Sequence, residues 1–474
     1  MRITLPTTPR RRVFAASVAV AFTACWTAVG VSMPASADPG QSDAPPVISP
    51  ARPLPLPPEL DPGFYHQPPE VLAATAPGGI IAARQVTLAN FSVFPLNVDA
   101  WQVAYRSNNS RDEPISAVAT LIKPRGVAPE PRKLLSMQLA EDSTAGYCTP
   151  SYGLQHLSLS ALGGQLDVPG EFILAQGALQ QGWALVIPDH QGPESAFAAG
   201  PLAARITLDG IRAATSFAPL EVGPTAPVGM YGYSGGSIPT VHAAELHPSY
   251  APELNIKGAA AGGVGADLGM AVDMANGQAT SGVVLAAVLG LSREYPEFEA
   301  FLEEKMDPVG RTLLAAKAPL CVQYQGAVLP FLNIKGMMRT PGDPLREPVV
   351  AAMLDETRMG SELPDMPMFL WHSALDEVLP LAATDQLVDS YCRNPDATVR
   401  YTRDHLSEHV IAGIAGFPSA MLWLRDRLNE VPVDAGCSVQ DVPSMVGDAE
   451  QQAYFASVVG ETVAALFGKA IGAR

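Results

Sequence analysis

The stretch PVGMYGYSGGSIPTVHAAEL, residues 227–246, decides the fold. Its first six residues are apolar or glycine, which is typical of a strand buried on both faces. Its last ten residues have a helical pattern. The GYSGG motif at 232–236 lies between them and matches G-x-S-x-G, a sharp strand-to-helix turn that exposes a nucleophilic serine. The sequence therefore predicts Ser234 as a nucleophile. In such a turn, the N–H of Gly235 points toward the place where an oxyanion would develop.

Apolar runs and helical patterns alternate along the rest of the chain from about residue 84. This alternation predicts an α/β fold with a mostly parallel sheet flanked by helices. The stretch 267–360 is helical, with Gly and Pro interruptions, and we expect it to form a helical cap insertion. The expected strands are 101–106, 116–122, 133–139, 183–188, 227–232, 367–372 and 398–402, and the expected helices are 170–181, 201–216, 237–246, 381–391 and 417–429.

A serine nucleophile needs a base and an orienting acid, and in this arrangement both follow the serine, the acid first. Asp376 lies just past the end of an expected strand and is the predicted acid. Glu377 is its rival, but we expect it to point outward. Two histidines follow the next strand. His409 opens an apolar helical run and is the predicted base, whereas His405 is the more exposed alternative.

The composition excludes several classes of protein. There are 47 acidic and 30 basic residues, a net charge of −17, which argues against nucleic acid as a partner. Hydrophobic residues make up 47% of the chain and charged residues 16%, so the chain is too apolar to be disordered. The 45 prolines and 41 glycines predict many turns and long ordered loops.

The first residues have the features of a secretion signal. Arg10–Arg12 form a basic region, and an apolar stretch leads to the small-residue pattern that ends at Ala37. We predict cleavage near Ala37 and a location outside the cell or in the cell envelope, with an uncleaved membrane anchor as the alternative. The stretch 11–14 also resembles a twin-arginine signal, so the export route stays open. A proline-rich arm follows, extended and polyproline-like over 38–70.

Four cysteines remain after the signal: Cys148, Cys321, Cys392 and Cys437. An even number in an exported chain predicts two disulfides, and three connectivities are possible. Free buried thiols are the alternative. No two of these cysteines have the close spacing of metal ligands, so we expect no metal site.

Taken together, these motifs resemble the secretory lipase family, the fungal lipase A type with actinobacterial members. The resemblance rests on the GYSGG turn, on ALDEVLP around Asp376 and on SEHV around His409. Three further stretches are similar to segments of that family: DPGFYHQPP at 61–69, MQLAEDSTAGYC at 137–148 and IPDHQGPESAFAAG at 187–200. The resemblance covers about 60 to 430.

The resemblance implies an α/β-hydrolase core with a helical cap, a Ser234–Asp376–His409 triad, and an oxyanion hole made by Asp142 and Gly235. Whether Asp142 donates through its backbone or through a protonated carboxyl stays open. It also implies the pairs Cys148–Cys321 and Cys392–Cys437. The expected organisation is a signal at 1–37, an arm at 38–83, a core at 84–266 and 361–440, a cap at 267–360 and a helical end at 441–474.

The expected protein is a secreted carboxylic ester hydrolase, a lipase in the first place, that uses no metal or organic cofactor. A short-chain carboxylesterase or an acyltransferase with the same site is the first alternative. A catalytically silent envelope-binding protein is the second. Apolar cap residues are candidates for an acyl tunnel. The expected partner is an ester or lipid substrate, with transient contact with a lipid interface through helix 454–471, although packing of that helix onto the fold is favoured.

Overall fold

The computed structural model describes residues 46–127, 131–328, 330–447 and 449–472, so the predicted signal at 1–37 lies outside the described residues. An eleven-stranded sheet crosses the protein in the order β1-β2-β5-β6-β8-β7-β9-β10-β11-β12-β13. All pairs from β8 to β13 are parallel, while β2, β5, β6 and β8 pair antiparallel. The mostly parallel α/β fold predicted from the sequence is confirmed.

The strands of this sheet are β1 (Ile48–Ser49), β2 (Ile80–Gln85), β5 (Asp99–Asn108), β6 (Pro114–Lys123), β7 (Leu134–Gln138), β8 (Ala184–Pro188), β9 (Val228–Tyr233), β10 (Ile256–Gly262), β11 (Met368–Ser373), β12 (Thr398–Asp404) and β13 (Gly436–Val442). The strands β7, β8, β9 and β11 are buried at every residue, as their continuous apolar runs predict. A separate small pair joins β3 (Ala89–Asn90) to β4 (Phe94–Pro95).

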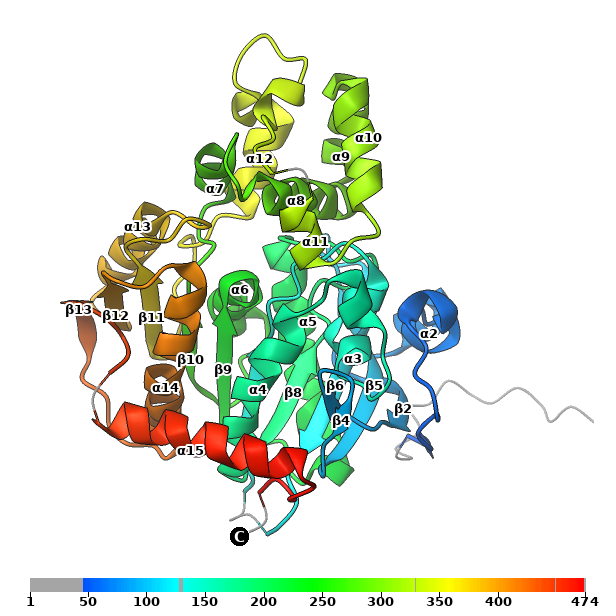
Figure 1. Ribbon diagram of the computed structural model, residues 1–474, viewed down its shortest axis with the longest axis vertical. Helices are drawn as coiled ribbons and strands as arrows, with labels where there is room; N and C mark the ends of the chain where they lie inside the picture. Colours follow the sequence, from blue (N-terminus) through cyan, green and yellow to red (C-terminus); the bar gives the residue numbers. More distant parts are fainter. Residues whose placement is uncertain (1–45, 128–130, 329, 448, 473–474) are drawn as a thin grey trace, which may run out of the picture. The chain divides into compact units, whose positions relative to one another are not determined.

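Helices cover the sheet on both faces (Figure 1). The last of them, α15, packs against α4 and α14 and buries Val458 and Ala465. None of the helices in the described ranges is long and apolar enough to cross a membrane. The flanking helices are α3 (Pro150–Gly153), α4 (Asp167–Gln180), α5 (Gly200–Ser216), α6 (Ser237–Tyr250), α13 (Leu381–Cys392), α14 (His409–Leu428) and α15 (Ala449–Leu466).

Between β10 and β11 the chain forms a group of helices, and no strand occurs there among the described residues. These helices lie beyond the carboxyl ends of the central strands (Figure 1). They are α7 (Leu268–Ala275), α8 (Ser281–Glu294), α9 (Pro296–Lys305), α10 (Pro308–Lys317), α11 (Val322–Ala327) and α12 (Pro348–Glu356). They fall within the stretch 267–360, and we call them the cap helices.

The proline-rich arm is more ordered than expected. It contains the short helices α1 (Pro62–Tyr65) and α2 (Pro69–Ala74), so the expectation of an extended segment over 38–70 was wrong for this part. The physical reason is Arg84 on β2. Its guanidinium lies 3.8 Å from the ring centroid of Phe64 and pairs with Asp61, so it binds the arm to the sheet.

Candidate active site

Ser234 follows β9 directly and precedes α6, in the turn that the GYSGG motif predicts. Its φ of +52° lies in the left-handed region, where a non-glycine residue is strained. A Cβ on Gly232 would lie 2.0 Å from the carbonyl oxygen of Gly236, and a Cβ on Gly236 would lie 2.0 Å from the carbonyl oxygen of Gln138. Only glycine fits at these two positions, and their absence of side chains lets the turn close and present the serine hydroxyl.

His409 is the first residue of α14, and its ring contacts the serine. Its Nε2 lies 2.8 Å from Ser234 Oγ, and its Nδ1 lies 2.6 Å from Asp376 Oδ2. The hydroxyl of Tyr233 donates to the carbonyl of His409 and fixes its backbone. The structure therefore brings together the serine, the histidine and the aspartate that the sequence selects, in a chain of contacts that suits proton transfer.

Asp376 lies in the loop after β11 with its side chain fully buried. Its Oδ1 accepts hydrogen bonds from the N–H groups of Val378 at 2.8 Å and Leu379 at 2.7 Å. Burial alone would raise the pKa of Asp376, but the hydrogen bond with His409 and the positive charge that His409 can carry outweigh it and lower that pKa. Burial opposes charge on His409 as well, yet Asp376 raises the pKa of that ring above its ordinary value. The pair is therefore poised to hold a proton taken from Ser234.

The two rivals, His405 and Glu377, and two further histidines lie elsewhere or make other contacts. His405 has a side chain that is 48% exposed, and its Nε2 pairs with Asp441 at 2.7 Å. Glu377 is exposed, and its Oε2 accepts from the backbone N–H of His409 at 3.3 Å rather than from the ring. His190 and His242 are buried beside backbone carbonyls, and desolvation lowers the pKa of each to about 4. Of these four residues, none contacts the Ser234 hydroxyl.

Asp142 lies against the glycine that follows the serine. A Cβ on Gly235 would lie 1.5 Å from Asp142 Oδ1, so the carboxyl occupies the space that a side chain would need. Asp142 itself has a φ of +43°, in the left-handed region. Its Oδ1 is buried and has no hydrogen-bond partner among the described residues. The carboxyl is thus free to bind a group that arrives at Ser234.

The backbone N–H of Asp142 has a partner that the sequence did not reveal. With its amide oriented to satisfy both of its polar atoms, Gln191 accepts from that N–H at 3.0 Å and donates to the carbonyl of Ser143. Burial, followed by the charge of Asp167, raises the pKa of the Asp142 carboxyl to about 7. The carboxyl can therefore be protonated near neutral pH and can act as the donor that the backbone N–H, already bonded, does not provide.

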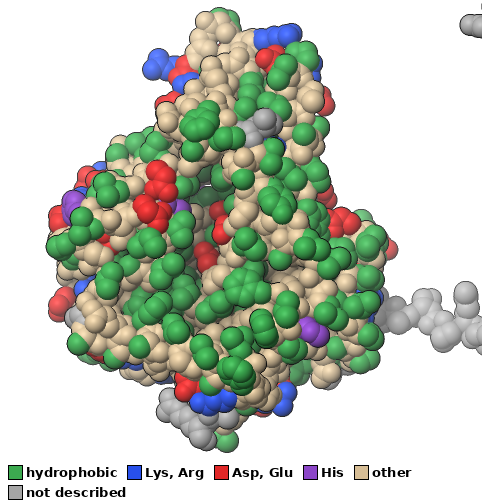
Figure 2. Space-filling model, in the orientation of Figure 1, with side chains coloured by type: hydrophobic (Ala, Val, Ile, Leu, Met, Phe, Trp, Pro, Cys, Tyr) green, Lys and Arg blue, Asp and Glu red, His purple; other side chains and the backbone are tan. Residues whose placement is uncertain are grey.

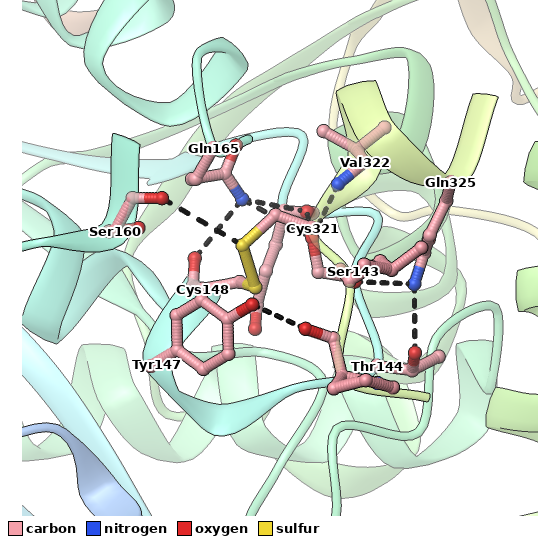
Figure 3. The surroundings of a disulfide bond; sticks show 12 residues. Ser143, Thr144, Tyr147, Cys148, Ser160, Gln165, Cys321, Val322 and Gln325 are labelled. Carbon is pink, nitrogen blue, oxygen red and sulfur yellow. Dashed lines mark hydrogen bonds between the residues drawn. A yellow bond between two sulfur atoms is a disulfide. The ribbon is translucent and has the colours of Figure 1, made fainter. Parts of the chain in front are cut away.

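The loop that carries Asp142 is tied to the cap helices (Figure 3). The disulfide Cys148–Cys321 joins the end of this loop to the start of α11, and Ser143 Oγ accepts from the N–H of Val322 at 3.2 Å. Gln325 donates to Thr144 Oγ1 at 2.8 Å. The second disulfide, Cys392–Cys437, joins the end of α13 to β13. These are the two pairings that the resemblance implies.

A cavity in the cap has an almost wholly apolar lining. Lys335 is the one charged residue in the lining, and its Nζ is bound by Asp273 and Asp343. Leu268 lines the cavity and is five residues along the chain from Gly263. A Cβ on Gly263 would lie 3.1 Å from Cε1 of His409. Five residues of chain span at most about 18 Å, which limits the distance between Leu268 and Gly263. The lining residues are Leu268, Ala271, Val272, Val284, Ala287, Val288, Leu291, Phe298, Phe301, Leu302, Met306, Ile334, Lys335, Met338, Pro344, Leu345, Val350, Met353 and Leu354.

The described ranges contain no group of three or more His, Cys, Asp or Glu side chains that could hold a metal ion.

The fold and site define an α/β-hydrolase. The structure is similar to that of Candida antarctica lipase A, with a TM-score of 0.78 and 29% identity, covering 88% of this chain and 98% of that one. Residues 157–436 match the secretory lipase family, and the chain belongs to that family. It is therefore a carboxylic ester hydrolase.

Two relatives extend this comparison over most of the chain. Lipase A of Arthroderma benhamiae is 35% identical over 438 residues, which cover 90% of this chain and 92% of that one. A protein of Mycobacterium tuberculosis named as a probable inactive lipase is 32% identical over 381 residues, which cover 80% and 84%. The resemblance seen in the motifs thus extends beyond them to almost the full length.

Proposed function

We propose that the protein is a secreted lipase in which Ser234, His409 and Asp376 form the catalytic triad. The contact of 2.8 Å between Ser234 Oγ and His409 Nε2 carries this proposal, because it places the nucleophile within reach of its base. His409 takes the serine proton while Asp376 holds the ring, and Ser234 Oγ attacks the ester carbonyl. The alcohol leaves with a proton from His409, and water then hydrolyses the acyl-enzyme in the same way.

The oxyanion of each tetrahedral intermediate is held between Gly235 and Asp142. The backbone N–H of Gly235 donates from one side. The protonated carboxyl of Asp142 donates from the other, since its backbone N–H is bound by Gln191. An ionised carboxylate would repel the oxyanion, so this role needs the elevated pKa of about 7.

The acyl chain of the substrate extends into the apolar cavity of the cap. The lining of this cavity supports a hydrocarbon ligand, because a single charged side chain lies in it and that charge is already paired. A lipase with a long acyl preference is therefore favoured over the alternatives, a short-chain carboxylesterase or an acyltransferase using the same site.

Exposed apolar side chains border the site and support contact with a lipid interface. Figure 2 shows hydrophobic side chains gathered over the face that carries α4, α14 and α15, around a hollow below the cap helices. The net charge of −17 favours a neutral surface over an anionic one. The exposed residues nearest in sequence to Asp376 and His409 are Leu375, Leu406, Val410, Ile411 and Ile414, and those before α4 are Leu157, Leu159, Leu162 and Leu166.

Secretion is supported by the basic and apolar pattern before Ala37, by the family's secretory character and by two disulfides in the chain. Mass spectrometry of the protein from the culture medium tests this directly. The expected result is a mature N-terminus near residue 38. An intact chain that stays inside the cell would contradict it.

The deciding experiment is hydrolysis of p-nitrophenyl esters with acyl chains from two to eighteen carbons, by the protein 38–474 and its Ser234→Ala variant. We expect activity that peaks at long chains and falls by about 10⁴-fold or more in the variant. A peak at two to four carbons would favour the carboxylesterase. A relative is named as a probable inactive lipase. Because such a relative exists, a complete absence of serine-dependent activity would overturn the proposal and favour an envelope-binding protein.

A further inference from the structure

A second buried histidine lies beside the proposed triad. His372 is in β11, four residues before Asp376, and its side chain is completely buried. Its Nδ1 receives a hydrogen bond from the backbone N–H of Val264 at 3.2 Å, and the hydroxyl of Thr384 lies 2.8 Å from the same nitrogen. One imidazole therefore connects β11 with the end of β10 and with α13.

The contact with Val264 fixes the protonation state of this ring. A backbone N–H can only donate, so Nδ1 of His372 must carry a lone pair and its proton must be on Nε2. Burial favours the same neutral form and lowers the pKa of His372. With Nδ1 as an acceptor, the hydroxyl of Thr384 is the donor in the 2.8 Å contact with that nitrogen. The ring is thus a neutral imidazole with a single N–H donor.

That donor points at the loop of the catalytic acid. Nε2 of His372 lies 3.1 Å from the carbonyl of Leu379 and 3.3 Å from Asp376 Oδ2, the oxygen that also binds His409. Leu379 in turn donates its own N–H to Asp376 Oδ1. The loop is therefore held from both sides, and the positive end of an N–H dipole lies beside the carboxylate.

We infer that His372 is a positioning residue for the triad: as a neutral imidazole, it fixes the loop of Asp376 against the end of β10 through the hydrogen bond of its Nε2–H to the carbonyl of Leu379, with Asp376 beside that N–H. Val264 follows Gly263, whose Cα faces Cε1 of the His409 ring, so His372 binds both segments that surround the acid–base pair. This inference rests on the proposed triad.

A donor beside Asp376 also adjusts how strongly His409 holds its proton. The N–H of His372 offsets part of the negative charge on Asp376, and without it that charge would stabilise protonated His409 more strongly. The pKa of His409 should then rise. The other charged groups that act on these two rings are Glu377 from the same loop, Asp142 from the oxyanion side and Asp385 in α13. They remain when His372 is replaced.

Two substitutions separate the functions of the two ring nitrogens. In His372→Asn the amide oxygen can take the place of Nδ1 and keep the bond to Val264, but no donor reaches Leu379 or Asp376. In His372→Gln the amide nitrogen can take the place of Nε2 and restore that donor. His242→Asn is the matched control, because it removes another buried imidazole with one nitrogen beside a backbone carbonyl, outside the triad.

For His372→Asn we expect kcat for p-nitrophenyl ester hydrolysis to fall about 10- to 100-fold with KM unchanged, as small misplacements of catalytic groups do. The acid limb of the pH profile should move upward by roughly half a unit. His372→Gln should recover most of kcat. The inference is overturned when His242→Asn causes the same changes, or when His372→Asn leaves kcat and the profile as they are.

A titration that needs no catalysis separates this inference from the proposed function. The His409 ring can be followed by NMR against pH in Ser234→Ala and in the double variant with His372→Asn. A higher pKa for His409 in the double variant supports the positioning role, even in a protein without esterase activity. An unchanged titration of His409 contradicts it, whatever the activity of the wild type.

Discussion

Asp376 reaches Ser234 through His409 and Asp142 lies against Gly235, and different parts of the chain hold the two carboxyls. Asp376 accepts hydrogen bonds from Val378 and Leu379 in its own loop. The Asp142 loop, in contrast, is held by the side chain of Gln191 and by contacts with the cap across 179 and 181 residues. The Asp376 loop is therefore held mainly by its own backbone, whereas the Asp142 loop depends on distant segments.

This difference explains how far each side can be predicted. A local turn has a local signature, as GYSGG and ALDEVLP show, whereas a loop held by long-range contacts has none. The oxyanion side should accordingly respond to changes in the cap, and the acid–base side should respond less.

Gly235→Ala should produce the largest effect among the changes to the surroundings of Asp142. Its new Cβ would lie 1.5 Å from Asp142 Oδ1, so the carboxyl must leave the oxyanion position. We expect kcat to fall by about 10³-fold, the upper range for losing an oxyanion donor. Esterase assays and thermal melting would measure activity and folding together. Gly460→Ala is the control, because nothing lies within 4 Å of its Cβ position. Near-normal activity in Gly235→Ala would contradict the assignment of Asp142.

Asp142 itself gives a prediction about pH. Activity should rise as His409 loses its proton and fall as Asp142 loses its own, near its pKa of about 7. Asp142→Asn keeps a donor that cannot ionise, so the alkaline limb due to this group should disappear. Asp142→Ala should lose about 10²-fold in kcat at every pH. An unchanged alkaline limb in Asp142→Asn would assign that limb to another group.

Particular elements show where sequence reasoning was sufficient. The strands β9 and β11 have strong apolar runs, one leading into the GYSGG turn at Ser234 and the other ending just before Asp376. The positions of Ser234 and Asp376 at the carboxyl ends of these strands were therefore predictable. The strand β10, IKGAAAG, was not predicted, because Ala and Gly have little strand preference and its stability comes from the neighbours β9 and β11.

The chemistry of the site was predictable only in part. The position of Asp142 came from family resemblance, and the structure was needed to find that Gln191 occupies its backbone N–H. His372 lies in the apolar run of β11, and no motif singles it out. It is buried and hydrogen-bonded, but its proximity to Asp376 follows from the register of β11 and a turn that no motif indicates.

The two disulfides allow a comparison of the same chemical change on the two sides. Cys148–Cys321 ends the Asp142 loop, whereas Cys437 is level with Val399 at the start of β12, away from the catalytic edge. Replacing each pair by serines should lower the free energy of unfolding. The loss should be about 5 kcal/mol for Cys148–Cys321, which are 173 residues apart, and about 4 kcal/mol for Cys392–Cys437, which are 45 residues apart. Only the first change should also lower kcat, by about tenfold, because it releases the oxyanion loop.

Chemical denaturation and esterase assays on both double variants check this prediction, with temperatures kept well below each melting point. Equal losses of kcat in the two variants would mean that general destabilisation, and not the attachment of the Asp142 loop to the cap, controls the rate.

His405→Ala should have the smallest effect and tests the assignment of the base. His405 and His409 are four residues apart, yet His405 is half exposed and pairs with Asp441, while His409 bridges Ser234 and Asp376. Because surface substitutions rarely affect function strongly, kcat/KM of His405→Ala should stay within about twofold of the wild type. His409→Ala should lose about 10⁴-fold or more. The reverse result would mean that the loop after β12 rearranges on substrate binding and that exposure in the free protein is a poor guide to the base.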